Sequence, residues 1–314
     1  MKIIVTHNSP DLDAVSSAWF IKRFLPGWED AEVVTVPAGS RINTDRVSSD
    51  VFEHLDGKEV IHVDTGMGPL DHHQTEDENI CAAKLTFDYV YDNSDELKKN
   101  EHKTEALRRF IDYVIDDDHF QEVYYPDPAA DVHEFSLVSL LSGIKVQYPR
   151  DDKTCIRFGF DLIDGAIHGF ENRIWAEEEI KEKGIEFQTK WGKGIEIETI
   201  NDDVLKVVQM LGYVIAVRRD PKSGAVRIKA RPKKRVRGSP REYSGQAQLT
   251  LKSSIEDVNV DLTPIYEKLK KMDPEASWFL HVSKRMLLNG SSKNPQMKGS
   301  KLTLPEVVEV LQNL

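Results

Sequence analysis

A chain of 314 residues, 39% of them hydrophobic, is long enough for one large domain or two medium ones. No apolar run approaches the roughly 18 residues of a membrane-spanning helix, and the first residues lack the long apolar stretch of a signal peptide, so we expect a cytoplasmic protein with no membrane partner. The net charge of −11 argues against stable binding of duplex DNA, and two cysteines cannot form a disulfide framework.

The first third of the chain alternates strand and helix patterns. Apolar runs rich in β-branched residues predict strands at 2–8, 31–39 and 59–66, and the apolar spacing of residues 9–25 predicts a helix between the first two. We expect the polar stretch 40–58 to be partly helical. This order predicts a mostly parallel sheet flanked by helices, in which ligands lie beyond the carboxyl ends of the strands.

Helical patterns then dominate up to residue 190. They include 81–91, a segment that ends near residue 115, and a charged run that we interpret as a connecting helix. The GKG at 192–194 marks the expected domain boundary. The sequence therefore predicts an α/β protein with a first domain over residues 1–190, which ends in the connecting helix, and a smaller α+β domain over residues 191–314.

The second domain contains sequence patterns typical of strands. The runs 212–220 and 225–232 flank the turn PKSG and predict a hairpin, and we expect a strand at 277–282. We also expect a short helix at 261–271, a loop at 283–300 and a closing helix at 304–314. Residues 218–241 hold eleven Lys or Arg and one Asp. This basic strip either binds a phosphate-bearing substrate or is a solvated hairpin.

Acidic and imidazole side chains follow the predicted strands. His7, Asp11 and Asp13 come after the first strand, and Asp64 ends the third. Asp11 and Asp13 straddle a loop-to-helix junction, so their carboxylates could face different ions, although an Asp at a helix start is often an N-cap.

Two further motifs add ligand-type side chains. The stretch LDHHQT contains Asp71, His72 and His73, and a triple Asp at 116–118 ends a later apolar segment. Carboxylates that converge on one point repel each other unless divalent cations neutralise them. Such a set favours two cations, Mn²⁺ first and Mg²⁺, Co²⁺ or Fe²⁺ as alternatives, over a thiolate zinc site. Two such ions are a recurrent device for phosphoester cleavage.

Four ordered motifs resemble those of the DHH phosphoesterase superfamily. HNSPDLDA resembles its first motif, H-x-x-P-D-x-D-A, HVDTG its second, the DHH at 71–73 its third and an Asp of IDDDHF its fourth. The resemblance covers about residues 1–120 and implies that the first domain is a DHH metal-binding catalytic domain. It implies one cation held by His7, Asp11 and Asp64, and another held by Asp13, Asp64, His72 and the fourth-motif Asp.

The fourth-motif residue is assigned to Asp117, because the preceding YVI run aligns best that way, with Asp116 and Asp118 as alternatives. The resemblance also implies two catalytic residues. His73 would contact the scissile phosphate, and Asp71 would orient an imidazole.

The second half resembles the family's C-terminal substrate-binding domain less clearly. AVRIKARP resembles a strand that ends in a phosphate-contacting Arg, but the family's GGGH loop is absent and LNGSSKNP is its nearest equivalent. The expected substrate-binding residues are Arg231, Lys284, Arg285, Asn289, Gly290, Ser291, Ser292 and Lys293.

The resemblance implies an enzyme, a divalent-metal-dependent phosphodiesterase or exonuclease. It would hydrolyse short RNA, other short oligonucleotides or linear or cyclic dinucleotides with a two-metal-activated hydroxide. The alternatives are an inorganic pyrophosphatase or exopolyphosphatase of the same superfamily, and a non-catalytic phosphate- or RNA-binding protein. A homodimer is compatible with each of these hypotheses.

Overall fold

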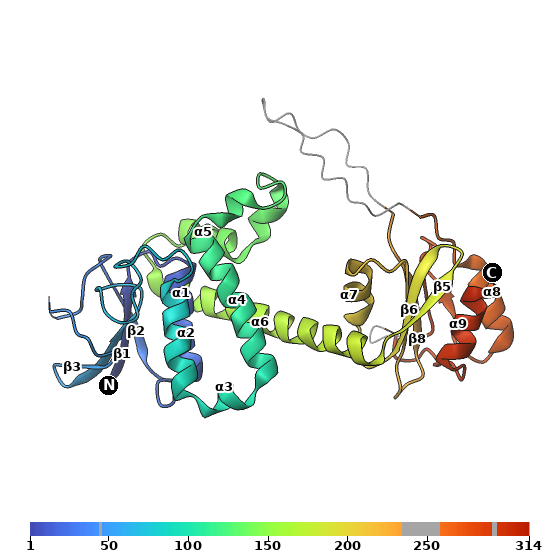
Figure 1. The fold of residues 1–314 in the computed structure, drawn as a ribbon, viewed down its shortest axis with the longest axis horizontal. Helices are drawn as coiled ribbons and strands as arrows, with labels where there is room; N and C mark the ends of the chain where they lie inside the picture. Colours follow the sequence, from blue (N-terminus) through green and yellow to red (C-terminus); the bar gives the residue numbers. More distant parts are fainter. Residues whose placement is uncertain (44–45, 234–257, 291–293, 314) are drawn as a thin grey trace, which may run out of the picture. The chain divides into compact units, whose positions relative to one another are not determined.

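The computed structural model describes residues 1–43, 46–233, 258–290 and 294–313, and it confirms a mixed α/β protein (Figure 1). The chain divides into two compact units, Met1–Glu171 and Asn172–Leu314. The division falls inside helix α6 (Asp152–Lys183), not at the GKG that the sequence suggested. That GKG lies in a strand, and Gly194 is required there because a Cβ would lie 2.5 Å from the Phe187 ring.

The first unit contains a four-stranded sheet in the order β2-β1-β4-β3. Strand β1 (Lys2–His7) pairs in parallel with β2 (Glu32–Val36) and with β4 (Lys58–His62). The short strand β3 (Glu53–Leu55) pairs with β4 in an antiparallel hairpin. The expectation of helix in 40–58 was therefore wrong for the described residues. Asp56 and Gly57, both with positive φ, instead form the tight turn that hairpins favour.

Five helices besides α6, and two short 3-10 turns, complete this unit. They are α1 (Leu12–Phe24), α2 (Ala82–Asn93), α3 (Asp95–Lys99), α4 (Glu101–Asp118), α5 (Leu137–Gln147), η1 (Gln121–Tyr124) and η2 (Asp131–Phe135). Helices α1, α2 and α4 pack side by side (Figure 1). Their core contains the rings of Trp19, Phe20 and Phe110, which pack edge-on or tilted at 5.1–6.4 Å between centroids. Residues Leu12 to Ile21 are buried on all sides of the helix, so packing fixes the position of the start of α1.

The second unit contains a six-stranded sheet in the order β5-β6-β7-β8-β10-β9. Its strands are β5 (Ile185–Thr189), β6 (Gly192–Glu198), β7 (Ile215–Arg219), β8 (Val226–Ala230), β9 (Phe279–Leu280) and β10 (Met286–Leu288). The pairs are antiparallel except β6–β7. The predicted hairpin around PKSG is therefore confirmed as β7–β8. Strand β10 lies in a stretch that the sequence assigned to a loop, because three apolar residues between basic and polar ones give too short a pattern.

Helices cover both faces of this sheet. Ile215 and Val217 of β7 join the core that contains α8 (Thr263–Met272) and α9 (Leu304–Gln312). Ala216, on the opposite face, joins a core that contains α7 (Val204–Met210) and the last turns of α6. Alternate side chains of one strand thus serve two cores. No helix of the described residues is long and apolar enough to cross a membrane.

Candidate metal centre

The first group of ligand-type atoms lies at the carboxyl ends of β1 and β4. His7 ends β1, and Asp64 follows β4 by two residues. The Nε2 atom of His7 lies 3.2 Å from Asp64 Oδ2 and 3.4 Å from Asp11 Oδ2. The Nδ1–H of His7 donates to the Asn8 carbonyl over 2.9 Å, and this leaves the Nε2 lone pair directed at the two carboxylates when the ring is neutral.

Asp11 combines the two roles that the sequence left open. Its Oδ1 accepts a hydrogen bond from Ala14 N at 3.0 Å and so caps α1, while its Oδ2 faces His7. Asp13, in the first turn of the helix, is buried and also has a structural role. Its two oxygens accept the N–H groups of Ala82 and Ala83, at 2.8 and 2.6 Å, at the start of α2. A carboxylate has about four lone-pair positions, so each oxygen of Asp13 can still bind a cation.

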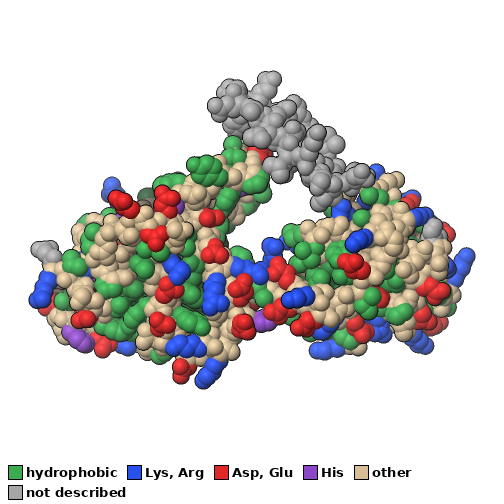
Figure 2. Space-filling view, in the orientation of Figure 1, with side chains coloured by type: hydrophobic (Ala, Val, Ile, Leu, Met, Phe, Trp, Pro, Cys, Tyr) green, Lys and Arg blue, Asp and Glu red, His purple; other side chains and the backbone are tan. Residues whose placement is uncertain are grey.

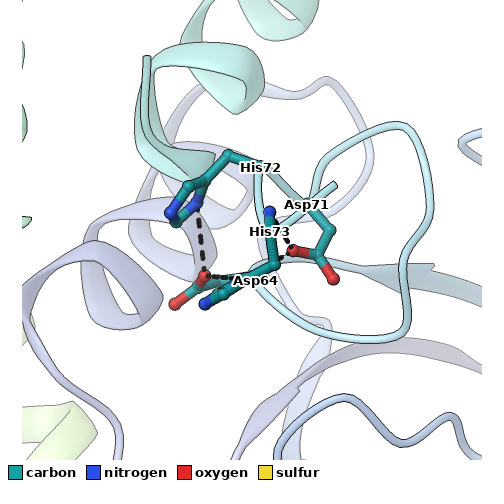
Figure 3. A group of neighbouring side chains, drawn as sticks. All are labelled: Asp64, Asp71, His72 and His73. Atoms are coloured by element: carbon teal, nitrogen blue, oxygen red, sulfur yellow. Dashed lines mark hydrogen bonds and ion pairs between the residues drawn. The ribbon is translucent and has the colours of Figure 1, made fainter. Parts of the chain in front are cut away.

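The second group comprises Asp13, His72 and Asp118. His72 Nδ1 lies 3.4 Å from Asp13 Oδ2, and its Nε2 lies 3.1 Å from Asp118 Oδ2. Asp64 Oδ1 lies 3.7 Å from the same Nδ1 (Figure 3). Asp64 therefore directs one oxygen at each group, as the shared ligand of the two-cation arrangement would.

The structure brings Asp118, and not the expected Asp117, into this group. Asp118 is the last residue of α4, and its Oδ2 lies 3.1 Å from His72 Nε2. Asp117 lies on a different face, where burial and the charge of Glu122 raise its pKa to about 7. Residues seven positions before each of the two, Phe110 and Ile111, are both buried, so the helical pattern of the sequence does not distinguish Asp117 from Asp118. The third residue of the triplet, Asp116, accepts a hydrogen bond from the Tyr125 hydroxyl at 3.0 Å.

Asp71 is buried and fixes the neighbouring imidazole. Its Oδ1 accepts the Nδ1–H of His73 at 2.8 Å and its Oδ2 accepts Met67 N at 2.7 Å (Figure 3). The His73 ring stacks on that of His72 with 4.4 Å between centroids, and 58% of its side chain is exposed. Asp71 thus orients His73, while the exposed Nε2 of His73 has no partner in the described part of the chain.

Burial and mutual repulsion shift the titration of the cluster. Burial, strengthened by the charges of Asp64 and Asp118, raises the pKa of Asp13 well above its usual range. Burial also raises the pKa of Asp64 to about 6. The hydrogen bond with Asp118 raises the pKa of His72 to about 9, and although burial opposes it, hydrogen bonding to two carboxylates raises the pKa of His7 to about 11. The cluster therefore retains protons that a divalent cation would displace.

Two unpartnered atoms test whether a cation fits. Asp64 Oδ1 and His72 Nδ1 are among the buried side-chain atoms of the described residues that have no hydrogen-bond partner. Both are common metal-ligand atoms. Three overlapping groups each have their ligand atoms within 4.8 Å of one another, namely His7–Asp11–Asp64, Asp13–His72–Asp118 and Asp64–Asp71–His72–His73. Imidazole nitrogens and carboxylate oxygens without thiolates suit Mn²⁺ or Mg²⁺.

A buried network that the sequence did not reveal holds the turn after β4. Arg41 Nη1 donates to the Gly66 carbonyl at 2.6 Å, and its Nη2 is paired with Glu53. His62, the last residue of β4, donates through Nδ1 to Glu53 at 3.0 Å. Asp64, in this turn, has the left-handed φ of +50°, which is unusual for a residue other than glycine. The network thus supports the turn that carries the shared ligand.

Comparisons with known proteins give no family for this chain. No family model and no curated protein matches it. Among solved structures, it is similar to the crystal structure of an uncharacterized protein from Helicobacter pylori G27. The sequence identity is 11% over 100% of this chain and 98% of that one, at a TM-score of 0.25, and such a similarity carries no argument about fold or function.

Two of the expected substrate-binding residues are instead part of the framework of the second unit. Arg285 is only 8% exposed and donates to the carbonyls of Arg231 and Val258 at 2.6 and 3.0 Å. Asn289 is fully buried, and its Oδ1 accepts Val226 N at 2.5 Å. Their polar groups thus hold strands and loops together, and a contact of either residue with substrate stays a prediction. Arg231 donates to the Gly212 carbonyl.

Lys284 is better placed for a ligand. Its exposed ammonium lies 3.3 Å from Asp261, at the wall of a cavity of about 820 Å³ that Lys229, Lys233 and His281 also line. Gly290, whose φ is +154°, lies at the other end of β10. Ser291, Ser292 and Lys293 lie outside the described residues.

Exposed aromatic side chains follow the candidate centre along the chain. Phe120, Tyr124 and Phe135 are 72%, 80% and 78% exposed. Phe120 stands two residues after Asp118 and has a φ of +56°. Figure 2 shows hydrophobic side chains at the surface of the part of the first unit that carries α5. Faces of exposed aromatic rings are surfaces on which nucleobases stack.

Proposed function

We propose that the protein is a divalent-metal-dependent phosphodiesterase of the DHH type, which hydrolyses short oligonucleotides or linear or cyclic dinucleotides. The observation that carries this proposal is Asp64, whose two carboxylate oxygens face two different imidazole–carboxylate groups. This arrangement lies at the carboxyl edge of a mostly parallel sheet, the usual position of ligand sites in such folds.

The residues divide into two ligand sets. His7, Asp11 and Asp64 would hold one cation, and Asp13, Asp64, His72 and Asp118 would hold the other. Two divalent cations supply a more acidic water at neutral pH and neutralise charge on phosphoryl oxygens. The chain contributes the spacing: Asp11 is fixed as the cap of α1, Asp13 as the cap of α2, and Asp64 by the turn that Arg41 supports.

His73 is the proposed phosphate contact. As an imidazolium it would donate Nδ1–H to Asp71 and Nε2–H to a phosphoryl oxygen, because Asp71 already holds the ring by its Nδ1. Asp71 accepts a second N–H from Met67 and is buried, so it acts by positioning His73 and does not touch substrate.

A nucleotide substrate is favoured over pyrophosphate by exposed aromatic side chains that follow Asp118 along the chain. Phe120, Tyr124 and Phe135 offer faces for base stacking, which a pyrophosphate or polyphosphate chain cannot use. Lys284, at the cavity of the second unit, stays a predicted phosphate contact of that unit. The two free cysteines, both buried, are compatible with a reducing compartment such as the cytoplasm.

A turnover screen tests the proposal. The full chain with Mn²⁺ is incubated with bis(p-nitrophenyl) phosphate, a linear dinucleotide, a cyclic dinucleotide, pyrophosphate and polyphosphate. We expect hydrolysis of the phosphodiesters, its loss with chelator, and its loss in Asp64→Asn but not in Asp92→Asn, whose carboxylate is exposed on α2. Turnover of pyrophosphate alone would indicate that the protein is an inorganic pyrophosphatase and not a phosphodiesterase. Binding of oligonucleotides without turnover of any substrate would show a non-catalytic binding protein.

A further inference from the structure

A second cavity adjoins the candidate metal centre within the first unit. It has a volume of about 600 Å³ and is lined by Asn8, Ser9, Lys145, Tyr148, Arg150 and Asp152, among others. These residues come from the loop after β1, the end of α5 and the start of α6. The volume lies within the roughly 300–1,000 Å³ of pockets that bind small organic ligands.

The cavity and the first ligand group share a wall. Asn8 and Ser9 stand in the loop between His7 and Asp11, and the Asn8 carbonyl accepts the Nδ1–H of His7 at 2.9 Å. The Lys145 side chain of this wall lies near enough to Asp11 for its charge to act on that carboxylate. Burial tends to raise the pKa of Asp11, but hydrogen bonding to His7 and, more weakly, the Lys145 ammonium bring it below its usual range.

The charges on the cavity wall favour an anion. Asp152 is the acidic residue of the wall, and its carboxylate is already engaged, since it accepts Ser9 N at 3.2 Å and the Thr35 hydroxyl at 3.0 Å. No carboxylate of the described residues lies within ion-pair distance of Lys145 or Arg150. The Lys145 ammonium and the Arg150 guanidinium can therefore bind an anionic ligand, because the charge of Asp152 is already compensated by its own hydrogen bonds.

The wall also carries groups suited to a nucleoside. The Tyr148 ring is 36% exposed and lies nearly parallel to that of Phe158, with 6.1 Å between centroids, so its position is set by packing. Asn8 offers a side-chain amide, which can donate and accept hydrogen bonds. A phosphate alone would leave most of this volume empty, whereas a nucleotide would use the cations, the ring and the amide together.

We propose that this cavity binds the nucleoside monophosphate group on one side of the scissile phosphodiester, with Lys145 and Arg150 on its phosphate and Tyr148 against its base or sugar. The inference rests on the proposed function and narrows it, because it names a nucleotide-containing diester as the substrate. The scissile phosphate would then lie next to His7 and Asp11, at the wall that the cavity shares with them.

Binding of adenosine 5′-monophosphate (AMP) tests this assignment without requiring turnover. Calorimetric titrations of Mn²⁺-loaded full chain with AMP, adenosine and inorganic phosphate are compared for wild type, Lys145→Met and Arg150→Met. The matched control is Lys99→Met, an exposed lysine of α3. We expect each cavity variant to weaken AMP binding about tenfold, equivalent to about 1.4 kcal/mol, and the control to leave it unchanged. Phosphate and adenosine should each bind more weakly than AMP.

The outcomes separate this inference from the proposed function. Unchanged AMP affinity in both cavity variants, or no AMP binding by wild type, would overturn the cavity assignment even if diesters are hydrolysed. Phosphate binding as tightly as AMP would also overturn it, because the nucleoside would then contribute nothing. Specific loss of AMP binding in both variants would support the cavity even if no diester is turned over, a result that would instead refute the phosphodiesterase proposal.

Discussion

Replacing Asp64 with Asn separates two effects of this buried carboxylate: its charge destabilises the metal-free protein, and its oxygens would bind Mn²⁺. Asn has almost the same shape but cannot ionise. The side chain lies 3.2 Å from His7 and 3.7 Å from both His72 and His73, so its charge acts on the whole cluster. We expect Asp64→Asn to stabilise the metal-free protein at alkaline pH and to abolish stabilisation by Mn²⁺.

The magnitude follows from the pKa of Asp64, which burial raises from 3.8 to about 6. Such a rise makes the ionised group unfavourable in the folded state by about 3 kcal/mol. The sign depends on pH. Well below pH 3.8 the carboxyl is protonated in both states and has no effect; the penalty develops as the pH rises from about 3.8 and is complete above 6. At pH 8 the metal-free variant should therefore be more stable than wild type by up to about 3 kcal/mol.

Thermal unfolding in chelator and in Mn²⁺ measures both effects. At about 2–4 °C per kcal/mol, the variant should melt about 6–12 °C higher than wild type in chelator at pH 8, and the gap should shrink to about 1–2 °C at pH 4. At Mn²⁺ a hundredfold above its dissociation constant, wild type should gain about 2.7 kcal/mol and the variant nothing. A variant that melts below wild type in chelator, or that still gains from Mn²⁺, refutes the reasoning. Asp92→Asn, an exposed change on α2, should behave as wild type in both conditions.

Three further outcomes are expected. Asp118→Asn should lower Mn²⁺-dependent turnover at least about 100-fold and Asp117→Asn only a few-fold, because only Asp118 lies beside His72, and equal losses in a steady-state assay would contradict the assignment. Mn²⁺ affinity should rise between pH 6 and pH 8, about tenfold per pH unit for each proton released, since the pKa of His72 is raised to about 9 and binding must displace that proton; a pH-independent calorimetric affinity would disprove this. Phe110→Ala should lower the free energy of unfolding by about 3–5 kcal/mol in urea titrations, because the ring is fully buried among those of α1, and a loss under 1 kcal/mol would show that this core is not tightly packed.

The sequence revealed most of the candidate centre because its residues follow strand ends. Strand β1 and the turn after β4 were predictable from apolar runs, and in a parallel sheet their carboxyl ends meet at one edge. His7 and Asp64 could therefore be expected together. The choice between Asp117 and Asp118 required the position of His72 in the folded chain, because Phe110 and Ile111, seven residues before each of them, are both buried.

The second unit was predicted less well because its polar residues had to be assigned without knowledge of their partners. Arg285 and Asn289 resemble substrate contacts in a linear sequence, yet each bonds to backbone groups of strands or loops that are distant along the chain. The network of Arg41, Glu53 and His62 was missed for the same reason, since its members are neighbours only after β3 and β4 form their hairpin.

Asp13 and Asp64 show how one centre can hold several buried carboxylates in a folded protein without metal. Asp13 lies where its charge is most unfavourable, yet its oxygens accept two N–H groups at the positive end of α2, so the helix compensates for part of the repulsion. Asp64 has no such partner for Oδ1 and depends on a turn with left-handed backbone. The unsatisfied lone pair therefore lies on the residue that both ligand groups share, where a cation would satisfy it.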